Sequence, residues 1–207
     1  MAITTFLTLK QAIGNWLGRD DLDARIPEFI SMAEDRIARN LRVQAMETSA
    51  DLSITSGSDT VAQPTGYLET IRLYLDDDRK RLTYMTPSVF WTRNAANESG
   101  TPEIFTIEDQ NFVFKPQPAS NFTGKLLYYK SFDALSGNAD TNWLLTNARG
   151  LLLYGALLEA YLYLEDDAGA AKYGLMFDNA LADLKKEDRM ARYPRGGNSA
   201  RSQVHIV

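Results

Sequence analysis

Hydrophobic residues recur at helical spacing near both ends of the chain, whereas the middle shows short apolar runs separated by turn residues. The first helix is predicted over residues 8–17. A longer helix is predicted over residues 23–43, with an apolar face that faces away from its charged positions. Pro27 is tolerated there because it falls in the first turn after an Asp23 cap, where few intrahelical bonds are lost. The N-terminal part of the chain is therefore predicted to be helical.

From Met46 to Phe132 the period changes to that of short β-strands bounded by turn residues. Residues 76–78 and 108–111 are typical of hairpin turns, and residues 87–94 are predicted to form a short helix between strands. The predicted strands are 52–55, 60–62, 70–75, 81–84, 104–107, 112–115 and 125–130. These segments together predict an antiparallel β module.

The helical period returns after a polar loop and predicts two helices, residues 142–165 and residues 168–193, with Asp166 and Asp167 as the cap between them. They should form an antiparallel hairpin, in which Gly155 and Gly174 allow close approach of the backbones. The first of these helices is apolar nearly all round, so a single small domain could hardly cover it. It is predicted either to be a central helix or to meet a neighbouring subunit. The interface residues predicted on it are Leu152, Glu159 and Tyr163.

These elements predict an α+β protein composed mainly of a helical bundle domain, with N-terminal helices and a C-terminal helical hairpin. The helical domain is predicted to comprise residues 1–45 and 142–193, and an inserted antiparallel β-rich domain to comprise residues 46–141. An extended C-terminal arm is predicted over residues 194–207.

The last fourteen residues contain no acid, begin with a proline and two glycines that end the preceding helix, and finish on β-branched residues. This pattern is typical of a strand that pairs with a neighbour, and it favours an arm that binds another subunit. A frayed chain end is the alternative, because termini are commonly disordered. The binding residues predicted on and beside the arm are Arg192, Tyr193, Arg195, Arg201, Val204, His205, Ile206 and Val207.

Composition describes a folded protein without a strongly basic surface. The chain has 207 residues, is 44% hydrophobic and carries 22 basic against 27 acidic residues, for a net charge of −5. A general grip on nucleic acid needs a basic surface, so any contact with DNA should be loose. Cysteine is absent, which excludes disulfides and thiolate chemistry. The most apolar stretch, residues 151–164, is too short for a bilayer and is interrupted by Glu159, so no membrane contact is expected.

Candidate chemistry is sparse, and no cofactor or metal site is predicted. His205 is the only histidine, so no catalytic triad or imidazole pair can form. Gly196 and Gly197 follow a helix instead of leading into one, which argues against a phosphate loop. Carboxylate pairs could in principle serve a glycoside hydrolase. The candidate acids are Glu108 and Asp109, Asp76, Asp77 and Asp78, Glu159, and Glu165, Asp166 and Asp167.

Each of these acids also has a structural explanation as a turn former, a helix cap or part of a solvated face, and this explanation is favoured. Glu159 is unusual because it lies within an apolar helix. A buried pair with Arg149 or Lys172 at a subunit seam is a better account of it than a catalytic acid.

Basic residues gather between Lys185 and Arg201, where the last helix becomes the arm. A solvated helix end that complements the helix dipole explains such a cluster. Docking to an acidic protein surface explains it equally well, and both are favoured over DNA binding.

The order of the segments resembles the head-to-tail adaptor proteins of tailed bacteriophages, over nearly the whole chain. The segments that carry the resemblance are Ile26-Pro27-Glu28-Phe29-Ile30 with Ala33-Glu34, Ile37 and Leu41-Arg42, Gly100-Thr101-Pro102-Glu103, Phe112-Val113-Phe114-Lys115-Pro116-Gln117-Pro118, Leu127-Tyr128-Tyr129-Lys130, Asn142-Trp143-Leu144-Leu145 and Leu152-Leu153-Tyr154-Gly155-Ala156-Leu157-Leu158-Glu159-Ala160.

This resemblance implies a structural virion protein without enzymatic activity, made in the host cytoplasm and located at the capsid–tail junction. Copies would form a dodecameric ring beneath the portal, with helices lining the DNA channel and the arms engaging the portal. Its partners would be the portal protein, a tail or nozzle protein, further copies of itself, and packaged DNA without specific binding. Another tail-interface ring protein, such as a stopper or tube-proximal component, and a cell-wall glycoside hydrolase are the alternatives.

Overall fold

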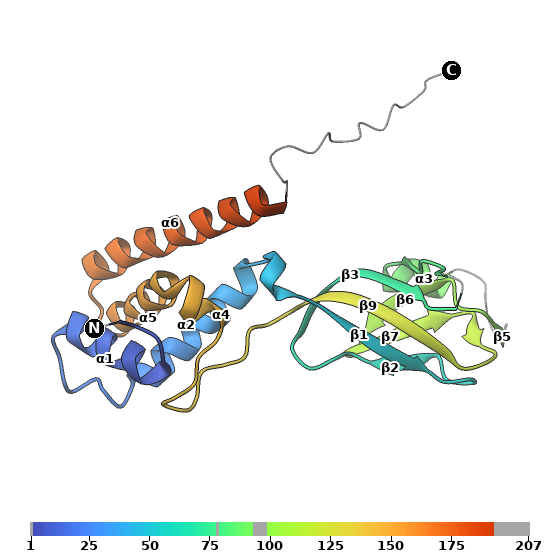
Figure 1. Ribbon diagram of the computed structural model, residues 1–207, viewed down its shortest axis with the longest axis horizontal. Helices are drawn as coiled ribbons and strands as arrows, with labels where there is room; N and C mark the ends of the chain where they lie inside the picture. Colours follow the sequence, from blue (N-terminus) through green and yellow to red (C-terminus); the bar gives the residue numbers. More distant parts are fainter. Residues whose placement is uncertain (1, 78, 93–98, 193–207) are drawn as a thin grey trace, which may run out of the picture. The chain divides into compact units, whose positions relative to one another are not determined.

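The chain folds into two compact units, shown in the computed structural model of Figure 1, which describes residues 2–77, 79–92 and 99–192. One unit, the helical unit, is formed by both ends of the chain, up to Gln44 and from Ala134 onward. The other, the β unit, is Ala45–Asp133. The described residues form six α-helices and nine strands, so the predicted α+β class is confirmed.

The helical unit contains α1 (Phe6–Leu17), α2 (Ile26–Asn40), α4 (Trp143–Asn147), α5 (Arg149–Tyr163) and α6 (Asp167–Arg192). The start predicted for α1 is two residues late, because the Thr5 and Thr8 side chains form a capping box. The predicted Asp23 cap of α2 is wrong: the helix begins after Arg25, which makes no side-chain cap bond. Pro27 lies in the first turn of α2, as predicted.

One helix predicted over residues 142–165 is in fact two. Ala148 adopts φ −136° and ψ 39°, outside the helical region, and separates α4 from α5. The side chain of Asn142 caps α4 by accepting from the backbone N–H of Leu145 at 3.0 Å. The predicted cap before α6 is confirmed, because Asp166 Oδ1 accepts from the N–H of Gly169 at 3.0 Å.

Helix α5 is the centre of the helical unit and packs against both α2 and α6. Its buried residues are Leu151, Leu152, Leu153, Gly155, Ala156, Leu157, Leu158 and Ala160. Of the two possibilities predicted for this helix, the structure shows a central helix, covered by its own unit over most of its length. A Cβ added at Gly155 would lie 3.0 Å from Ala33 Cβ and 3.2 Å from the Phe177 ring, so glycine allows the close approach there. At Gly174 the nearest atom would be a side-chain atom at 3.7 Å, which is ordinary contact.

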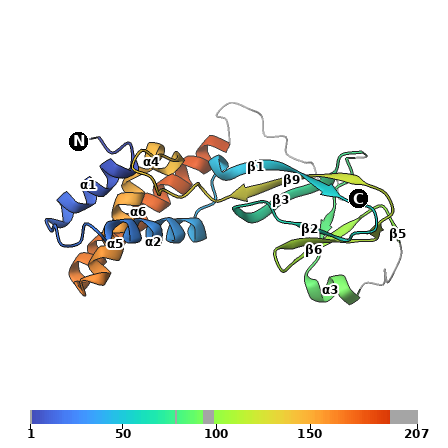
Figure 2. The same ribbon diagram turned by 90° about the horizontal axis from the view of Figure 1, so that it is seen from below.

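The β unit contains three sheets, and Figure 2 shows the larger two as separate layers. The first has the order β1-β9-β3, from β1 (Glu47–Ile54), β9 (Phe122–Lys130) and β3 (Tyr67–Leu75). The second has the order β2-β7-β6-β4, from β2 (Thr60–Ala62), β7 (Asn111–Lys115), β6 (Ile104–Glu108) and β4 (Thr83–Tyr84). The third pairs β5 (Ser99–Gly100) with β8 (Gln117–Pro118). The helix α3 (Pro87–Thr92) follows β4.

The prediction of an antiparallel module holds for most strand pairs but not for all. β4 runs parallel to β6 and β5 runs parallel to β8. The predicted turn at residues 108–111 does join an antiparallel hairpin, β6 to β7. Asp109 and Gln110 have φ values of 45° and 60° in that turn, the left-handed region that asparagine- and aspartate-rich hairpin turns use.

Both larger sheets contribute to one apolar core in the β unit. Leu52, Leu73 and Leu126 come from the first sheet, while Phe112 and Phe114 come from the second. Phe112 and Phe114 are fully buried. Burial of aromatic side chains from both layers is what holds the two sheets face to face.

Residues 134–141 were predicted within the β-rich domain but lie with the helical unit. Asp140 O accepts from the N–H of Phe6 at 2.9 Å, and Asn138 O accepts from the N–H of Leu7 at 3.1 Å. Leu135 is buried. These contacts attach the segment to the start of α1, and polar composition gave no sign of them.

Candidate assembly surfaces

The three residues predicted on α5 as an interface differ in how far they reach the surface. Leu152 is fully buried and fills the core of its own helical unit. Glu159 is largely buried, with 13% of its side chain exposed. Tyr163 is 50% exposed. Only Tyr163 therefore offers a substantial surface to another molecule.

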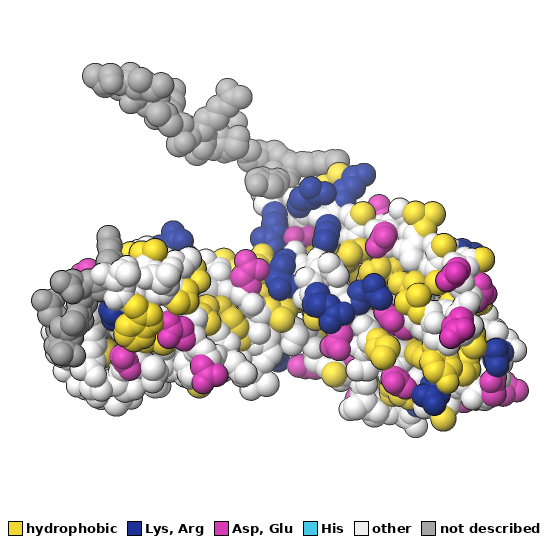
Figure 3. Space-filling view, turned by 180° about the vertical axis from the view of Figure 1, so that it is seen from behind, with side chains coloured by type: hydrophobic (Ala, Val, Ile, Leu, Met, Phe, Trp, Pro, Cys, Tyr) yellow, Lys and Arg dark blue, Asp and Glu magenta, His cyan; other side chains and the backbone are white. Residues whose placement is uncertain are grey.

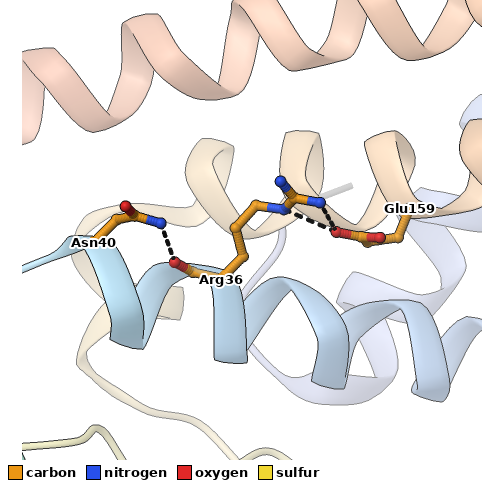
Figure 4. Close-up of polar contacts among 3 residues, drawn as sticks. All are labelled: Arg36, Asn40 and Glu159. Atoms are coloured by element: carbon orange, nitrogen blue, oxygen red, sulfur yellow. Dashed lines mark hydrogen bonds and ion pairs between the residues drawn. The ribbon is translucent and has the colours of Figure 1, made fainter.

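Glu159 is held by Arg36 of α2 (Figure 4). The Arg36 Nε and Nη2 atoms both donate to Glu159 Oε1, at 2.8 and 2.5 Å. Asn40 Nδ2 donates to the backbone oxygen of Arg36 at 2.8 Å, one turn along α2. The predicted partners were Arg149 and Lys172; the structure instead supplies a cation 123 positions earlier in the chain. The carboxylate that interrupts the apolar helix thus joins α5 to α2 inside one subunit.

Tyr163 lies at the end of α5 against the beginning of α2. Its ring centroid is 5.7 Å from that of Phe29, and the Arg25 guanidinium lies 5.0 Å from it. Phe29 is buried, while the adjacent Leu162 is 49% exposed. One side of the Tyr163 ring is thus held by its own subunit and the other is open to solvent.

A second aromatic group includes Trp16 of α1, which is 48% exposed. Its ring centroid lies 6.2 Å from that of Tyr154 and 6.3 Å from that of Tyr173. Tyr173 in turn stacks on Tyr161 at 5.1 Å. This group links α1, α5 and α6 and leaves a large apolar ring at the surface.

Glu34 is a carboxylate that the sequence did not single out as a candidate. Its Oε1 atom accepts from the N–H of Leu135 at 3.2 Å and from Asn142 Nδ2 at 3.3 Å. Burial raises the pKa of Glu34 to about 7, against the opposing effect of these two hydrogen bonds. The contacts attach the segment that re-enters the helical unit to α2, and through Asn142 they reach the cap of α4.

The acids considered for glycoside hydrolysis make structural contacts in several different places. Glu108 Oε1 accepts from Trp91 Nε1 at 2.6 Å, and Asp76 pairs with Lys125 at 3.6 Å. Asp109 lies in the β6–β7 turn, and Asp166 caps α6. Glu165 occupies the turn between α5 and α6 with φ 56°. Asp78 lies outside the described residues.

None of these acids lines either of two surface hollows that the structure describes. A hollow of about 590 Å³ beside β3 contains a single acid, Glu69. One of about 520 Å³ beside α1 contains Asp20 and Asp23. Within the described ranges, no group of three or more His, Cys, Asp or Glu residues is placed to hold a metal ion. The described candidate acids therefore share neither of these hollows, whereas a carboxylate pair requires a common cleft.

Arg192, the last described residue, lies at the end of α6 and donates from Nε to Asp188 Oδ2 at 2.8 Å. Asp188 Oδ1 also accepts from the N–H of Gln44 at 2.6 Å, so the end of α6 lies beside the chain that leaves α2. Figure 3 shows Lys and Arg side chains gathered around this end of α6. The other predicted arm residues, Tyr193, Arg195, Arg201, Val204, His205, Ile206 and Val207, lie outside the described residues.

Arg36 and Glu34 are the site residues that sequence reasoning missed. Both lie among the charged positions of α2, so they read as part of its solvated face. One signal pointed to Arg36. The single carboxylate in α5 requires a cation if it is buried, and α2, which was predicted to be amphipathic, carries cations that could supply it. No such signal existed for Glu34, because its partners are a loop N–H and an amide.

The family model described as SU10 adaptor protein matches residues 4–201 of the chain, which is nearly its whole length. No curated protein matches it. Among the described helices, none is both long and apolar enough to cross a bilayer.

Removal of one partner of the Arg36–Glu159 pair should destabilise the protein more than removal of both. Arg36→Met leaves a largely buried carboxylate without a cation and should lower the free energy of unfolding by about 2–3 kcal/mol. Arg36→Met combined with Glu159→Met should recover most of this loss, because both sites accept an unbranched apolar side chain. Urea denaturation of the three proteins measures the difference. A single variant as stable as the wild type would show that water already compensates the charge.

Glu34 should make stability depend on pH near neutrality. Its pKa is raised on folding, from 4.5 to about 7, so the folded state binds the proton more tightly. The stabilisation is fully present below pH 4.5 and is lost as the pH rises through 7. Glu34→Gln cannot ionise, and above pH 7 it should be more stable than the wild type by about 1–2 kcal/mol, a value reduced for partial solvent exposure. Thermal unfolding of both proteins at several pH values tests this; parallel stability curves would refute it.

Proposed function

Because the chain belongs to the SU10 adaptor protein family, and is thus a structural adaptor of a bacteriophage virion, we propose that copies of it form a ring beneath the portal. The ring connects the capsid to the tail, and the helical units line the channel through which DNA leaves. The observation that carries this proposal is the family match over residues 4–201, which includes both units.

Exposed aromatic and aliphatic side chains on the helical unit support the ring. Tyr163 and Leu162 at the end of α5, and Trp16 on α1, are each about half exposed. A ring requires two different faces on each subunit, one that meets the preceding copy and one that meets the next. The Tyr163 group and the Trp16 group supply two separate apolar patches for such contacts. Leu152 and Glu159 stabilise the subunit that forms the ring and are not proposed as contacts between subunits.

Net charge supports the channel role. With 27 acidic against 22 basic residues the protein as a whole is acidic, and the helical unit has nearly equal numbers of acidic and basic residues, so a wall that it forms does not attract a duplex strongly. A basic wall would instead hold the DNA by releasing its counterions. The protein therefore needs no specific contact with the packaged DNA.

The segment that follows α6 is proposed to bind the portal. It is free of acids and ends in Val204-His205-Ile206-Val207, an alternation that suits strand addition to a partner. A tail or nozzle protein is the proposed partner on the opposite side of the ring. A stopper or tube-proximal ring protein would share the general build, and its partner would be another tail component instead of the portal.

Deletion of residues 194–207 should leave the protein folded and abolish its attachment to the portal. Light scattering of the protein alone and mixed with assembled portal gives the mass of each species, and circular dichroism reports the fold. The wild type should add mass to the portal and the truncated protein should not. Equal attachment by both proteins would contradict the arm's role, and an attachment confined to tail components would favour the stopper alternative.

Tyr163→Asp should block ring formation and leave the subunit folded, because it places a charge on a half-exposed apolar contact. Tyr84→Asp is the matched control. Tyr84 is 52% exposed and packs on a buried phenylalanine at 5.6 Å, as Tyr163 does, but it lies in the β unit. Sedimentation velocity should show monomers for Tyr163→Asp and wild-type assembly for Tyr84→Asp. If Tyr163→Asp unfolds the subunit, the residue serves the monomer's own core and the interface lies elsewhere.

A further inference from the structure

The two ends of the helical unit carry opposite charge. Arg25 and Phe29, at the start of α2, contact Tyr163 at the end of α5, shortly before α6 begins. The N-terminal ends of α2 and α6 therefore lie at the same end of the unit. Exposed acids gather along the segments at this end: Asp20, Asp21, Asp23, Glu28, Glu165, Asp166 and Asp167.

The other end of the unit is basic. The hydrogen bond from the N–H of Gln44 to Asp188 Oδ1 brings the end of α2 beside the end of α6. Cations from segments about 150 positions apart in the sequence thereby come together. They are Arg39 and Arg42 at the end of α2, and Lys185, Lys186, Arg189 and Arg192 at the end of α6. This set is called the basic end below, and Figure 3 shows the α6 part of it.

Compensation of the helix dipoles accounts for part of this pattern, since acids stabilise helix N-termini and cations stabilise helix C-termini. It does not account for the surplus of charge at the basic end, where six cations lie among only three acids, Asp183, Glu187 and Asp188 in the last turns of α6. Elsewhere many cations are paired, such as Lys80 with Glu103 and Lys125 with Asp51. Within the part of the chain that the structure describes, Arg39, Lys186 and Arg189 have no carboxylate partner. All three are exposed.

We propose that the basic end is a docking surface for an acidic face of a partner protein. The proposal rests on the proposed function, in which that partner is the portal. The positive charge continues along the chain beyond Arg192, because residues 193–207 contain Arg195 and Arg201 and no acid. In this proposal the exposed cations at the ends of α2 and α6 face the partner, and the acidic end of the unit faces away from it.

An acidic protein face fits the basic end better than a nucleic acid does. The protein as a whole carries a net charge of −5, so a long polyanion that extends beyond the basic end meets repulsion from the rest of the surface. A compact acidic face on a protein meets only the basic end. Complementary charge of this kind mainly accelerates association and selects the partner.

The sharpest test compares Arg39→Glu with Lys186→Glu, because only the fold brings these two residues to one surface. Each variant should associate with assembled portal about tenfold more slowly than the wild type at low salt. The difference should disappear near 0.5 M salt, where the screening length falls to roughly 4 Å. Stopped-flow or surface-plasmon measurement of the association rate gives the comparison. Arg39→Gln and Lys186→Gln should show about half the effect on a logarithmic scale, since they remove one charge instead of reversing it.

The matched control is Arg79→Glu combined with Lys80→Glu, in the turn that follows β3 in the β unit. It changes the net charge more than either single variant and should leave the association rate within about twofold of the wild type. Circular dichroism verifies that every variant is folded. A rate unchanged by Arg39→Glu would overturn the proposal, and so would a control that slows association equally, because net charge would then be the cause.

Two further outcomes separate this inference from the proposed function. If the wild type does not bind portal at all, the proposed function fails. If it binds portal and both glutamate variants bind equally fast, the proposed function stands and the docking surface is wrong. Binding of the wild type to a 30-base-pair duplex at low salt, lost in Lys186→Glu, would assign the basic end to DNA and overturn the protein partner.

Discussion

Burial of α5 between α2 and α6 is the interaction on which the helical unit depends. Leucines cover almost the whole circumference of this helix, and Gly155 lets α2 and α6 approach it closely. The one carboxylate within the helix is neutralised by Arg36 on α2, so the packing does not leave a buried charge. The exposed residues of the helix are Arg149 in its first turn and Leu162 and Tyr163 in its last. Most of the large apolar side chains of this helix are thus buried in the subunit's own fold, and a small part, at Leu162 and Tyr163, stays exposed.

Helical periodicity and turn residues were sufficient to predict helices at both ends of the chain with strands between them, but not the break between α4 and α5 or the short strands β5 and β8. The resemblance to phage adaptors agrees with the family model. Sequence patterns were insufficient wherever contacts between distant parts of the chain determine the structure. The burial of residues 134–141 against α1 depends on backbone bonds to Phe6 and Leu7 that leave no trace in composition. The parallel pairing of β4 with β6 depends on how the chain crosses between strands, which strand propensity does not specify.

The candidate sites show the same limit. The exposure of Tyr163 follows from its position at the end of an apolar helix, and an apolar surface too large for one domain to cover indicated it. The partner of Glu159 could not be chosen among several cations without knowing which helix lies alongside α5. Glu34 could not be recognised from the sequence, because a carboxylate on the charged side of a helix is ordinary. It is partly buried, and its pKa is raised, in a fold where the segment at Leu135 returns to α2. The polarity of the helical unit likewise emerges only when α2 and α6 are seen to point the same way.

The insertion of the β unit between the two halves of the helical unit has a consequence for biosynthesis. As the chain leaves the ribosome, α1 and α2 emerge before α5, the helix that covers their apolar faces. The β unit is made next and can form its own core before α5 and α6 are available. The helical unit closes only when α5 and α6 have been made, after the whole of the β unit. The aromatic contact of Tyr163 with Phe29 therefore forms only after the whole β unit has been made, although Phe29 itself is made early.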